Sequence, residues 1–218
     1  MKKYSQILTL ATITLLLTGT VKADSNYVML GVNKLNSFDS QTYKTASGVG
    51  DDHSKGDIGG DFVIGKNYTD KLSFELAYSQ LNSELYKTKT SNGTTYYYGS
   101  NQISDLSNKS ELLTIRAKIK HIVKKHGFYL GAGIGRLKTT ATYTERMTNT
   151  TTSGTGYGYV YELMLGDRIS INDRFFVDVG VVQAFQEKVA YTATGALNGA
   201  YSKSYGTSRF VLSIGSTF

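Results

Sequence analysis

The sequence lacks several features, and each absence excludes a class of protein or a source of stability. It has no cysteine among its 218 residues, so no disulfide bond holds the fold. It has no proline, which the interior of a hydrogen-bonded sheet excludes. Beyond residue 23 no apolar run approaches the length of a transmembrane helix, which excludes a helical membrane protein. No tract of five or six basic residues is present, so we expect no nucleic-acid partner.

The first residues have the layout of a secretory signal peptide. A pair of lysines forms a basic start, and the uncharged run at residues 7–20 is too short to span a membrane as a helix. Residues 21–23 then resemble a cleavage site. We expect a signal peptide at residues 1–23 and one mature domain at residues 24–218. Removal of the leader leaves 21 basic and 17 acidic residues, so the mature charge is about +4.

What the mature chain does contain is residues that favour strands, arranged with a period of two. The full sequence has 17 tyrosines and 9 phenylalanines, all but Tyr4 beyond the leader, and threonine is also abundant. Apolar side chains alternate with polar or small ones in eight segments, at residues 28–33, 58–65, 72–79, 113–120, 128–135, 157–166, 175–182 and 209–218. We predict that each segment is a β-strand of about ten residues.

The connections between these segments alternate in length. Three are tight hairpins, at residues 67–71, 124–127 and 172–174, and four are long and polar, near 36–56, 87–109, 145–156 and 190–204. In an antiparallel sheet this rhythm puts all short turns at one end and all long loops at the other. Eight strands also bring both termini to the short-turn end.

The position of the charges decides which solvent surrounds the sheet. One face holds nearly all the large apolar residues, and the other holds glycines and nine charged residues: Asp61, Glu75, Arg116, Lys118, Lys120, Glu162, Arg168, Asp178 and Arg209. A water-soluble barrel would bury these charges and expose its apolar face. Turning the apolar face to lipid avoids both costs, and closure of the sheet satisfies the backbone. We therefore predict an all-β fold, an eight-stranded antiparallel up-and-down transmembrane β-barrel.

The inward charges are nearly balanced, four acidic against five basic. Eight strands enclose a space just wide enough for side chains, so we predict an interior ion-pair network of these nine residues that fills the lumen. Across the hairpin centred on Asp173, residues whose numbers sum to 346 face each other, which sets Arg168 opposite Asp178. A narrow or gated ion-conducting pore is the alternative use of the same charges.

Aromatic residues gather at the two ends of the predicted strands. Those at the short-turn end are Tyr68, Phe128, Phe175 and Phe218, and those toward the loops are Tyr78, Tyr143, Tyr157 and Tyr191. Girdles of this kind border the apolar band of a transmembrane barrel on both sides.

Two motifs accompany the strand rhythm, the glycine-rich YLGAGIG at residues 129–135 and the terminal RFVLSIGSTF. With them, the mature chain resembles the small eight-stranded outer-membrane barrels of Gram-negative bacteria, of the OmpA transmembrane-domain, OmpX and opacity-protein kind. The resemblance implies an outer-membrane location, extracellular loops, periplasmic termini and contact with outer-membrane lipid and lipopolysaccharide. It also implies an assembly signal for the barrel-assembly machinery, at Phe210, Leu212, Ile214 and Phe218. Ser216 departs from that pattern, in which an aromatic or large apolar residue is usual.

The first long loop contains the strongest candidate for chemistry. Some barrels of this size modify lipid A, and such a site needs a base near the outer rim. His53, within GDDHSKGD, is flanked by acidic residues and Ser54, whereas His121 and His126 fall near the short turns. A catalytic site is one interpretation, and a cation site with Asp51, Asp52 and Asp57 is another. No spaced motif supports either, so we expect a solvated loop, no enzyme, and no metal or cofactor.

The long loops are rich in Thr, Ser, Asn and Tyr, including Tyr96-Tyr97-Tyr98, with scattered basic residues. Tyrosine among small polar residues suits contact with macromolecules. The resemblance implies adhesion, invasion or serum resistance for such loops. We predict a monomeric structural and surface-interaction barrel that contacts a host surface ligand or lipopolysaccharide phosphates. The alternatives are an enzyme that modifies lipid A and the narrow pore.

Overall fold

A computed structural model describes most of the mature chain, in residues 26–35, 41–45, 48–52, 55–56, 58–91, 94–97, 102–145, 149–194, 201–202 and 205–218. The predicted signal peptide at residues 1–23 lies outside the described residues, as does His53. Among the residues that are described, no helix is long and apolar enough to cross a membrane.

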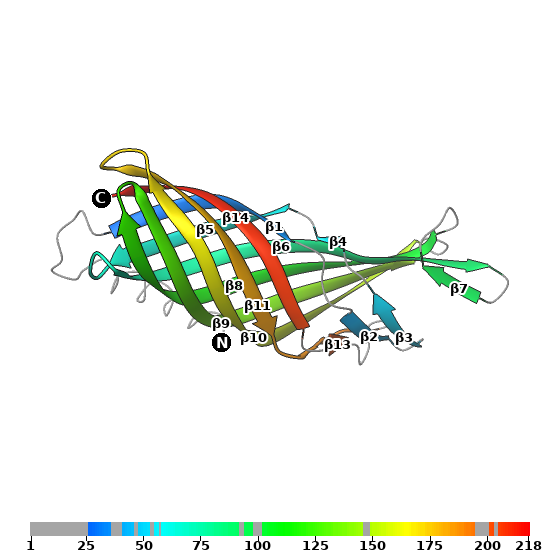
Figure 1. The fold of residues 1–218 in the computed structure, drawn as a ribbon. Coiled ribbons are helices and arrows are strands. Elements are labelled where there is room, and N and C mark those ends of the chain that lie inside the picture. The colour runs from blue at the N-terminus through cyan, green and yellow to red at the C-terminus, as the bar shows by residue number, and fades with distance from the viewer. Residues whose placement is uncertain are drawn as a thin grey trace.

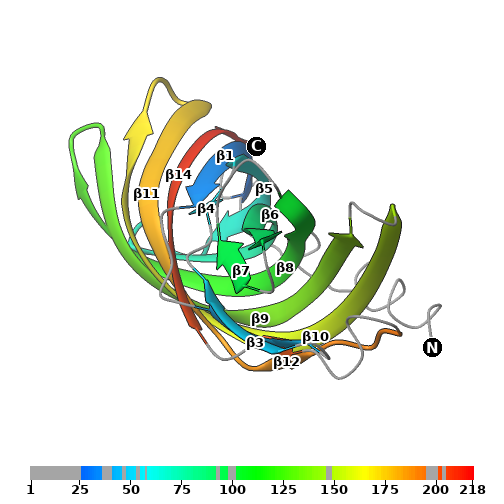
Figure 2. The same ribbon diagram turned by 90° about the vertical axis from the view of Figure 1, so that its right-hand side faces the viewer.

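Eight strands form a closed antiparallel ring. In ring order they are β1 (Asn26–Leu35), β14 (Tyr205–Thr217), β11 (Phe175–Gln186), β10 (Thr150–Ser170), β9 (His126–Glu145), β8 (Gln102–Val123), β6 (Leu72–Ser91) and β5 (Ile58–Asn67). Figure 1 shows the barrel from the side and Figure 2 from one end. The predicted eight-stranded antiparallel β-barrel is confirmed.

The last strand closes the ring against the first. β1 pairs with β14, so that Val28 lies opposite Ser216 and Val32 opposite Leu212. On its other side β14 pairs with β11. A closed up-and-down barrel requires this pairing of its last strand, RFVLSIGSTF, with its first, and the pairing is confirmed. At the level where all eight strands pair, closure leaves no open edge, so there the backbone hydrogen bonds are made within the sheet.

Four neighbouring strands are about twice as long as predicted. β6, β8, β9 and β10 have 20, 22, 20 and 21 residues, whereas β1, β5, β11 and β14 have 10, 10, 12 and 13. The loops predicted at 87–109 and 145–156 are therefore wrong for most of these residues, which are strand. The far halves of the four long strands form one side of the barrel and extend beyond the short strands in Figure 1. We call them the tall wall.

Along the tall wall the outer face changes from apolar to polar and the inner face becomes largely apolar. This inversion explains why these residues were predicted as loops. On β9 the even-numbered residues face outward and are apolar from Phe128 to Ile134, but Arg136 and Lys138 follow and the residues farther along are threonines. These threonines pair with Thr or Ser of β10 through side-chain hydrogen bonds of 3.2–3.3 Å. The odd-numbered, inward residues change from glycine to Leu137 and Ala141. A pattern of one continuous apolar face ends at this inversion although the strand does not.

The first and last long connections meet in a small second sheet. It contains β2 (Gln41–Thr45), β3 (Gly48–Asp52), β12 (Val189–Ala190) and β13 (Tyr201–Ser202), in the order β12-β13-β2-β3. Two further short strands, β4 (Lys55–Gly56) and β7 (Thr94–Tyr97), pair with β6. The small sheet lies at the tall-wall end of the barrel, away from the short turns (Figure 1). Parts of the predicted loops 36–56 and 190–204 are thus strand.

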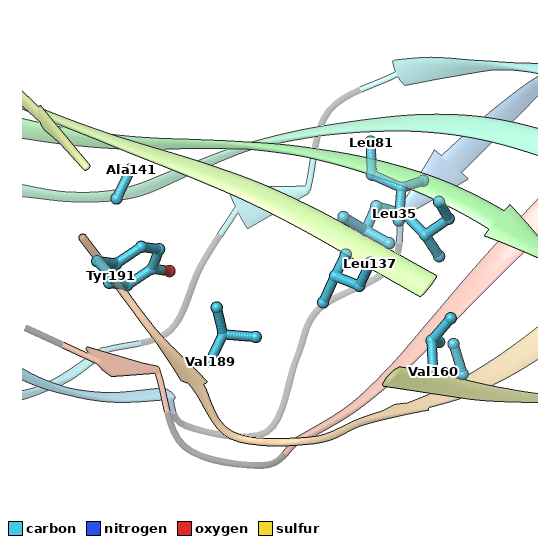
Figure 3. Packing of buried hydrophobic residues seen from close by; sticks show 9 residues of the cluster. Leu35, Leu81, Leu137, Ala141, Val160, Val189 and Tyr191 are labelled. Atoms are coloured by element: carbon cyan, nitrogen blue, oxygen red, sulfur yellow. The ribbon is translucent and has the colours of Figure 1, made fainter. Parts of the chain in front are cut away.

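The largest buried apolar cluster of the described residues lies inside the barrel, at the base of the tall wall. It consists of Leu35, Leu81, Leu112, Leu137, Ala141, Val160, Ala184, Val189 and Tyr191 (Figure 3). These residues come from β1, β6, β8, β9, β10, β11 and the segment that follows β11. Because they come from opposite sides of the ring, their side chains fill the lumen at this level. We call this cluster the apolar layer.

Replacing Leu112 by alanine is expected to destabilise the barrel by about 2–5 kcal/mol, because it leaves a cavity in the apolar layer. Leu112 is 0% exposed, whereas its neighbour Leu113 is 40% exposed on the outer face. L113A is therefore the matched control. Urea titration of heat-modifiable gel mobility in detergent micelles measures the stability of both variants. Equal midpoints for L112A and L113A would contradict a packed layer at this level.

Candidate functional site

The outer face of the ring carries an apolar belt to which all eight strands contribute. Its members, each 40% exposed or more, include Leu30, Val32, Phe62, Phe74, Ile115, Ile119, Leu130, Ile134, Leu163, Leu165, Val179, Leu212 and Ile214. An apolar surface that surrounds a whole molecule is unfavourable in water and suits the hydrocarbon of a bilayer.

Aromatic residues border the belt on both sides. Tyr68, Phe128, Phe175 and Phe218 are exposed near the short turns, and Tyr78, Tyr157, Tyr159 and Tyr161 are exposed toward the tall wall. The outward positions predicted for Tyr143 and Tyr191 are wrong. Tyr191 is buried in the apolar layer, and Tyr143 packs against it.

One extra residue between β11 and β12 accounts for the inward position of Tyr191. Paired residues of β10 and β11 have numbers that sum to 346 as far as Gln186. The next pair, Thr155 with Thr192, sums to 347. The irregularity lies at residues 187–188, where the strand is interrupted between β11 and β12. A shift of one residue moves every later side chain to the opposite face.

A group of four charged side chains fills the lumen near the short turns. This lower group consists of Glu75, Lys118, Arg168 and Asp178. Nζ of Lys118 lies 3.0 Å from Oε1 of Glu75 and 3.7 Å from Oδ2 of Asp178. Nη2 of Arg168 lies 3.2 Å and 3.0 Å from the same two oxygens. The predicted register is confirmed, with Arg168 opposite Asp178 in the β10–β11 pair.

Buried tyrosines hold the lower group in place. The hydroxyl of Tyr27 donates a hydrogen bond to Oε1 of Glu75 (2.8 Å), and the hydroxyl of Tyr129 donates one to Oδ1 of Asp178 (2.7 Å). The guanidinium carbon of Arg168 also lies 4.2 Å from the ring centre of Tyr27, a cation–π contact. The same residues therefore solvate the charges and pack against them.

A second group of charges lies between the lower group and the apolar layer. This upper group consists of Asp61, Arg116, Glu162 and Arg209. Oε2 of Glu162 accepts a hydrogen bond from Nε of Arg116 (2.7 Å), and Oε1 accepts one from Nη2 of Arg209 (2.6 Å). The hydroxyl of Ser79 donates to Asp61 and accepts from Nη2 of Arg209 at 3.5 Å. Ser79 thus connects the fourth member to the other three.

Lys120 is the ninth inward charge and belongs to neither group. Its side chain is buried, and Nζ donates a hydrogen bond to Oδ1 of Asn67 at 2.5 Å. Among the described carboxylates, none lies within ion-pair distance of this ammonium group. The structure therefore brings eight of the nine interior residues into two groups, each with two acidic and two basic members.

The residues predicted as an assembly signal lie on β14 and at the chain end. Phe210, Leu212 and Ile214 are exposed on the outer face, and Phe218 is exposed beside the short turns. The backbone N–H of Phe218 donates to the carbonyl oxygen of Asn26 at 3.0 Å, which extends the seam between the first and last strands.

The residues predicted as candidates for chemistry in the first loop cannot be assembled into a site. His53, Ser54 and Asp57 lie outside the described residues, and of Asp51 and Asp52 only the backbone, in β3, is described. The catalytic and cation-site interpretations of this loop remain hypotheses.

The two histidines near the short turns are exposed, as their positions at this end of the barrel imply. Nδ1 of His126 lies 2.6 Å from Oδ2 of Asp167, on the neighbouring strand. His121 lies on β8, and its side chain is exposed.

Sequence reasoning missed the apolar layer. Its signal was present, because Leu81, Leu112 and Leu137 occupy positions that the alternation assigns to the charged inner face. A large apolar residue at such a position indicates that the lumen is apolar at that level.

No protein-family model matches the sequence, and no curated protein matches it. Solved structures do match. The outer membrane protease OmpT of Escherichia coli is 7% identical with a TM-score of 0.57, over 92% of this chain and 99% of that one. The outer membrane protein OprG of Pseudomonas aeruginosa is 13% identical with a TM-score of 0.53, over 90% and 97%. Ail, the attachment invasion locus protein of Yersinia pestis, is 10% identical with a TM-score of 0.50, over 90% and 100%.

These similarities show the fold alone. The chain has the β-barrel fold of outer-membrane proteins, in agreement with the resemblance found in its sequence. One of the three similar proteins is a protease, so the shared fold does not decide whether this chain is an enzyme.

Replacing Glu162 by glutamine is expected to destabilise the barrel by about 3–5 kcal/mol, because two buried guanidinium groups lose their common partner. The side chain of Glu162 is 0% exposed. The control is E111Q, which breaks the partly exposed pair of Glu111 with Lys138 and is expected to cost less than about 1 kcal/mol. Urea unfolding followed by tyrosine fluorescence compares the two, and equal losses would contradict a paired interior.

Proposed function

We propose that the chain is a bacterial outer-membrane protein, with its short turns and both mature termini in the periplasm and its tall wall outside the cell. The apolar belt and its two aromatic borders support this location. Short periplasmic turns and longer extracellular segments are the usual arrangement of such barrels. At the periplasmic end, Phe210, Leu212, Ile214 and Phe218 serve as the signal for the barrel-assembly machinery.

The specific function is surface interaction through the tall wall. The observation that carries it is the inversion of polarity along these strands. Beyond Arg136 the outward side chains of β9 are polar and the inward ones are largely apolar, as in a sheet whose outer face meets water. From Arg136 to Glu145 the strand continues for roughly 30 Å, at about 3.3 Å per residue. A folded wall of this height gives a fixed contact surface above the bilayer.

Two parts of this surface suit two kinds of partner. At its base, Arg136 is exposed at the border of the belt, and Lys109, opposite Thr140, is exposed higher on the wall; such cations suit lipopolysaccharide phosphates. Above them, Thr and Ser side chains form rungs across β9 and β10, such as Thr142 with Ser153. Small hydroxyl side chains with nearby tyrosines suit a macromolecular ligand on a host surface.

The barrel beneath this surface is a closed scaffold. The two charge groups and the apolar layer occupy the lumen at successive levels, which supports a closed interior rather than a pore. Under this proposal, the protein is a monomer and has no catalytic activity.

We expect the purified barrel to give no unit conductance in planar lipid bilayers at neutral pH, because paired charges and packed apolar side chains leave no continuous water path. The measurement is single-channel recording with a general porin as a positive control for insertion. Reproducible conductance steps that disappear in a variant of the upper charge group would contradict a closed scaffold.

Shortening the β9–β10 hairpin tests the role of the tall wall. Residues 142–153 are replaced by Asn-Gly, which joins the paired residues Ala141 and Gly154 by a two-residue turn. Bacteria that display this variant are expected to bind host cells no better than bacteria without the protein, while heat-modifiable mobility is retained. L113A, a change within the belt, serves as the control and keeps wild-type binding. Undiminished binding by the shortened variant would rule out this hairpin as the contact surface.

A further inference from the structure

Of the nine inward charges that the structure describes, all but one belong to balanced groups. The lower group contains Glu75 and Asp178 with two cations, and the upper group contains Asp61 and Glu162 with two cations. Lys120 remains, buried at the end of the lumen near the short turns. A buried cation without a counter-charge is unfavourable, so its environment favours an anion from outside the chain.

Lys120 lines a hollow of about 170 Å³ at the short-turn end of the barrel. The other basic residues of the lining are Lys124, Lys125, His126, Arg168 and Arg174, and its single acidic residue is Asp173. Arg168 is engaged by the lower charge group, and His126 by Asp167. For the remaining four cations, no described carboxylate lies within ion-pair distance.

The turn that brings two of these lysines to the hollow has a backbone conformation that is unfavourable for lysine. Val123 pairs with His126, so Lys124 and Lys125 form a two-residue hairpin loop. Lys124 has a φ of 56°, in the left-handed region that asparagine and glycine adopt with least strain. Lysine thus occupies this position although its left-handed backbone conformation is strained.

The rim of the hollow decides which anion fits. Ile122 and Phe175 belong to the lining, and both are more than half exposed. Phe175 lies on the outward face of β11, at the edge of the apolar belt. A ligand in the hollow therefore meets cations on one side and the edge of the apolar belt on the other. A phospholipid head group satisfies both, because its phosphate is anionic and its acyl chains can follow the belt.

We propose that this hollow binds the phosphate group of an anionic phospholipid in the leaflet that faces the short turns. The proposal rests on the membrane location proposed above. Lys120 and the two turn lysines donate to the phosphate oxygens, and Arg174 adds a fourth positive charge at the rim. Free inorganic phosphate presents the same chemistry without the acyl chains and is the other source of the ligand.

Native mass spectrometry of the barrel in detergent micelles tests the proposal, with phosphatidylglycerol or zwitterionic phosphatidylcholine added. We expect phosphatidylglycerol to remain bound preferentially, and K124Q/K125Q to weaken its binding by about tenfold or more. The control is K66Q/K71Q, which removes two charges at the same end of the barrel but outside the hollow, and it retains binding. K120M is the second variant, with the same expected loss and with heat-modifiable mobility as its test of folding.

Each other outcome has a defined meaning. Equal loss in K124Q/K125Q and K66Q/K71Q, or no preference for phosphatidylglycerol, would overturn the hollow as a specific site. Displacement of the lipid by excess inorganic phosphate, with phosphate binding alone seen by phosphorus NMR, would support the site and assign it to soluble phosphate. Vesicle flotation tests membrane insertion separately, so that failure to insert refutes the membrane location rather than the chemistry of the hollow.

Discussion

The narrow lumen of an eight-stranded barrel is the constraint on which the rest of the structure depends. Every inward side chain must find its partner among other inward side chains, since little water fits between them. Arg116 and Lys118 of β8 meet this demand by reaching acidic partners on other strands, Glu162 and Glu75. In lipid there is no outward alternative for these charges, and leaving one unpaired would cost several kcal/mol.

The same constraint explains the glycines of YLGAGIG, which face the lumen on β9. A Cβ atom at Gly133 would lie 2.9 Å from Cγ of Arg116, and one at Gly131 would lie 2.9 Å from Cγ of Lys118. Glycine therefore provides the space through which the long basic side chains of β8 cross the lumen. The sequence motif and the ion pairs are two aspects of one packing solution.

The sequence was sufficient to predict the barrel and its inner charges because each half-strand within the belt repeats the same pattern. Asp61, Glu75 and the other inner charges all lie at alternate positions that face away from the apolar face. The register of Arg168 with Asp178 followed from a short turn alone. Local patterns do not record which charges meet across the lumen, so the division into two groups and the isolation of Lys120 could not be predicted. The inward position of Tyr191 was missed because it depends on one interruption in the strand after Gln186.

Because polarity inverts along the tall wall, one sheet combines the side-chain pattern of a membrane barrel with that of a water-soluble β-protein. Within the belt the surroundings are apolar, and charges occupy the interior. Above it the outer rungs are Thr and Ser, and the interior contains Leu137, Ala141 and Tyr191, as in a soluble β-protein. The apolar layer lies where the two regimes meet, between the charge groups and the outside. Because it keeps external water from the upper group, it lowers the local dielectric and strengthens the pairing of Glu162 with its two arginines. The feature that lets the strands rise above the bilayer is thus also the one that closes the barrel below them.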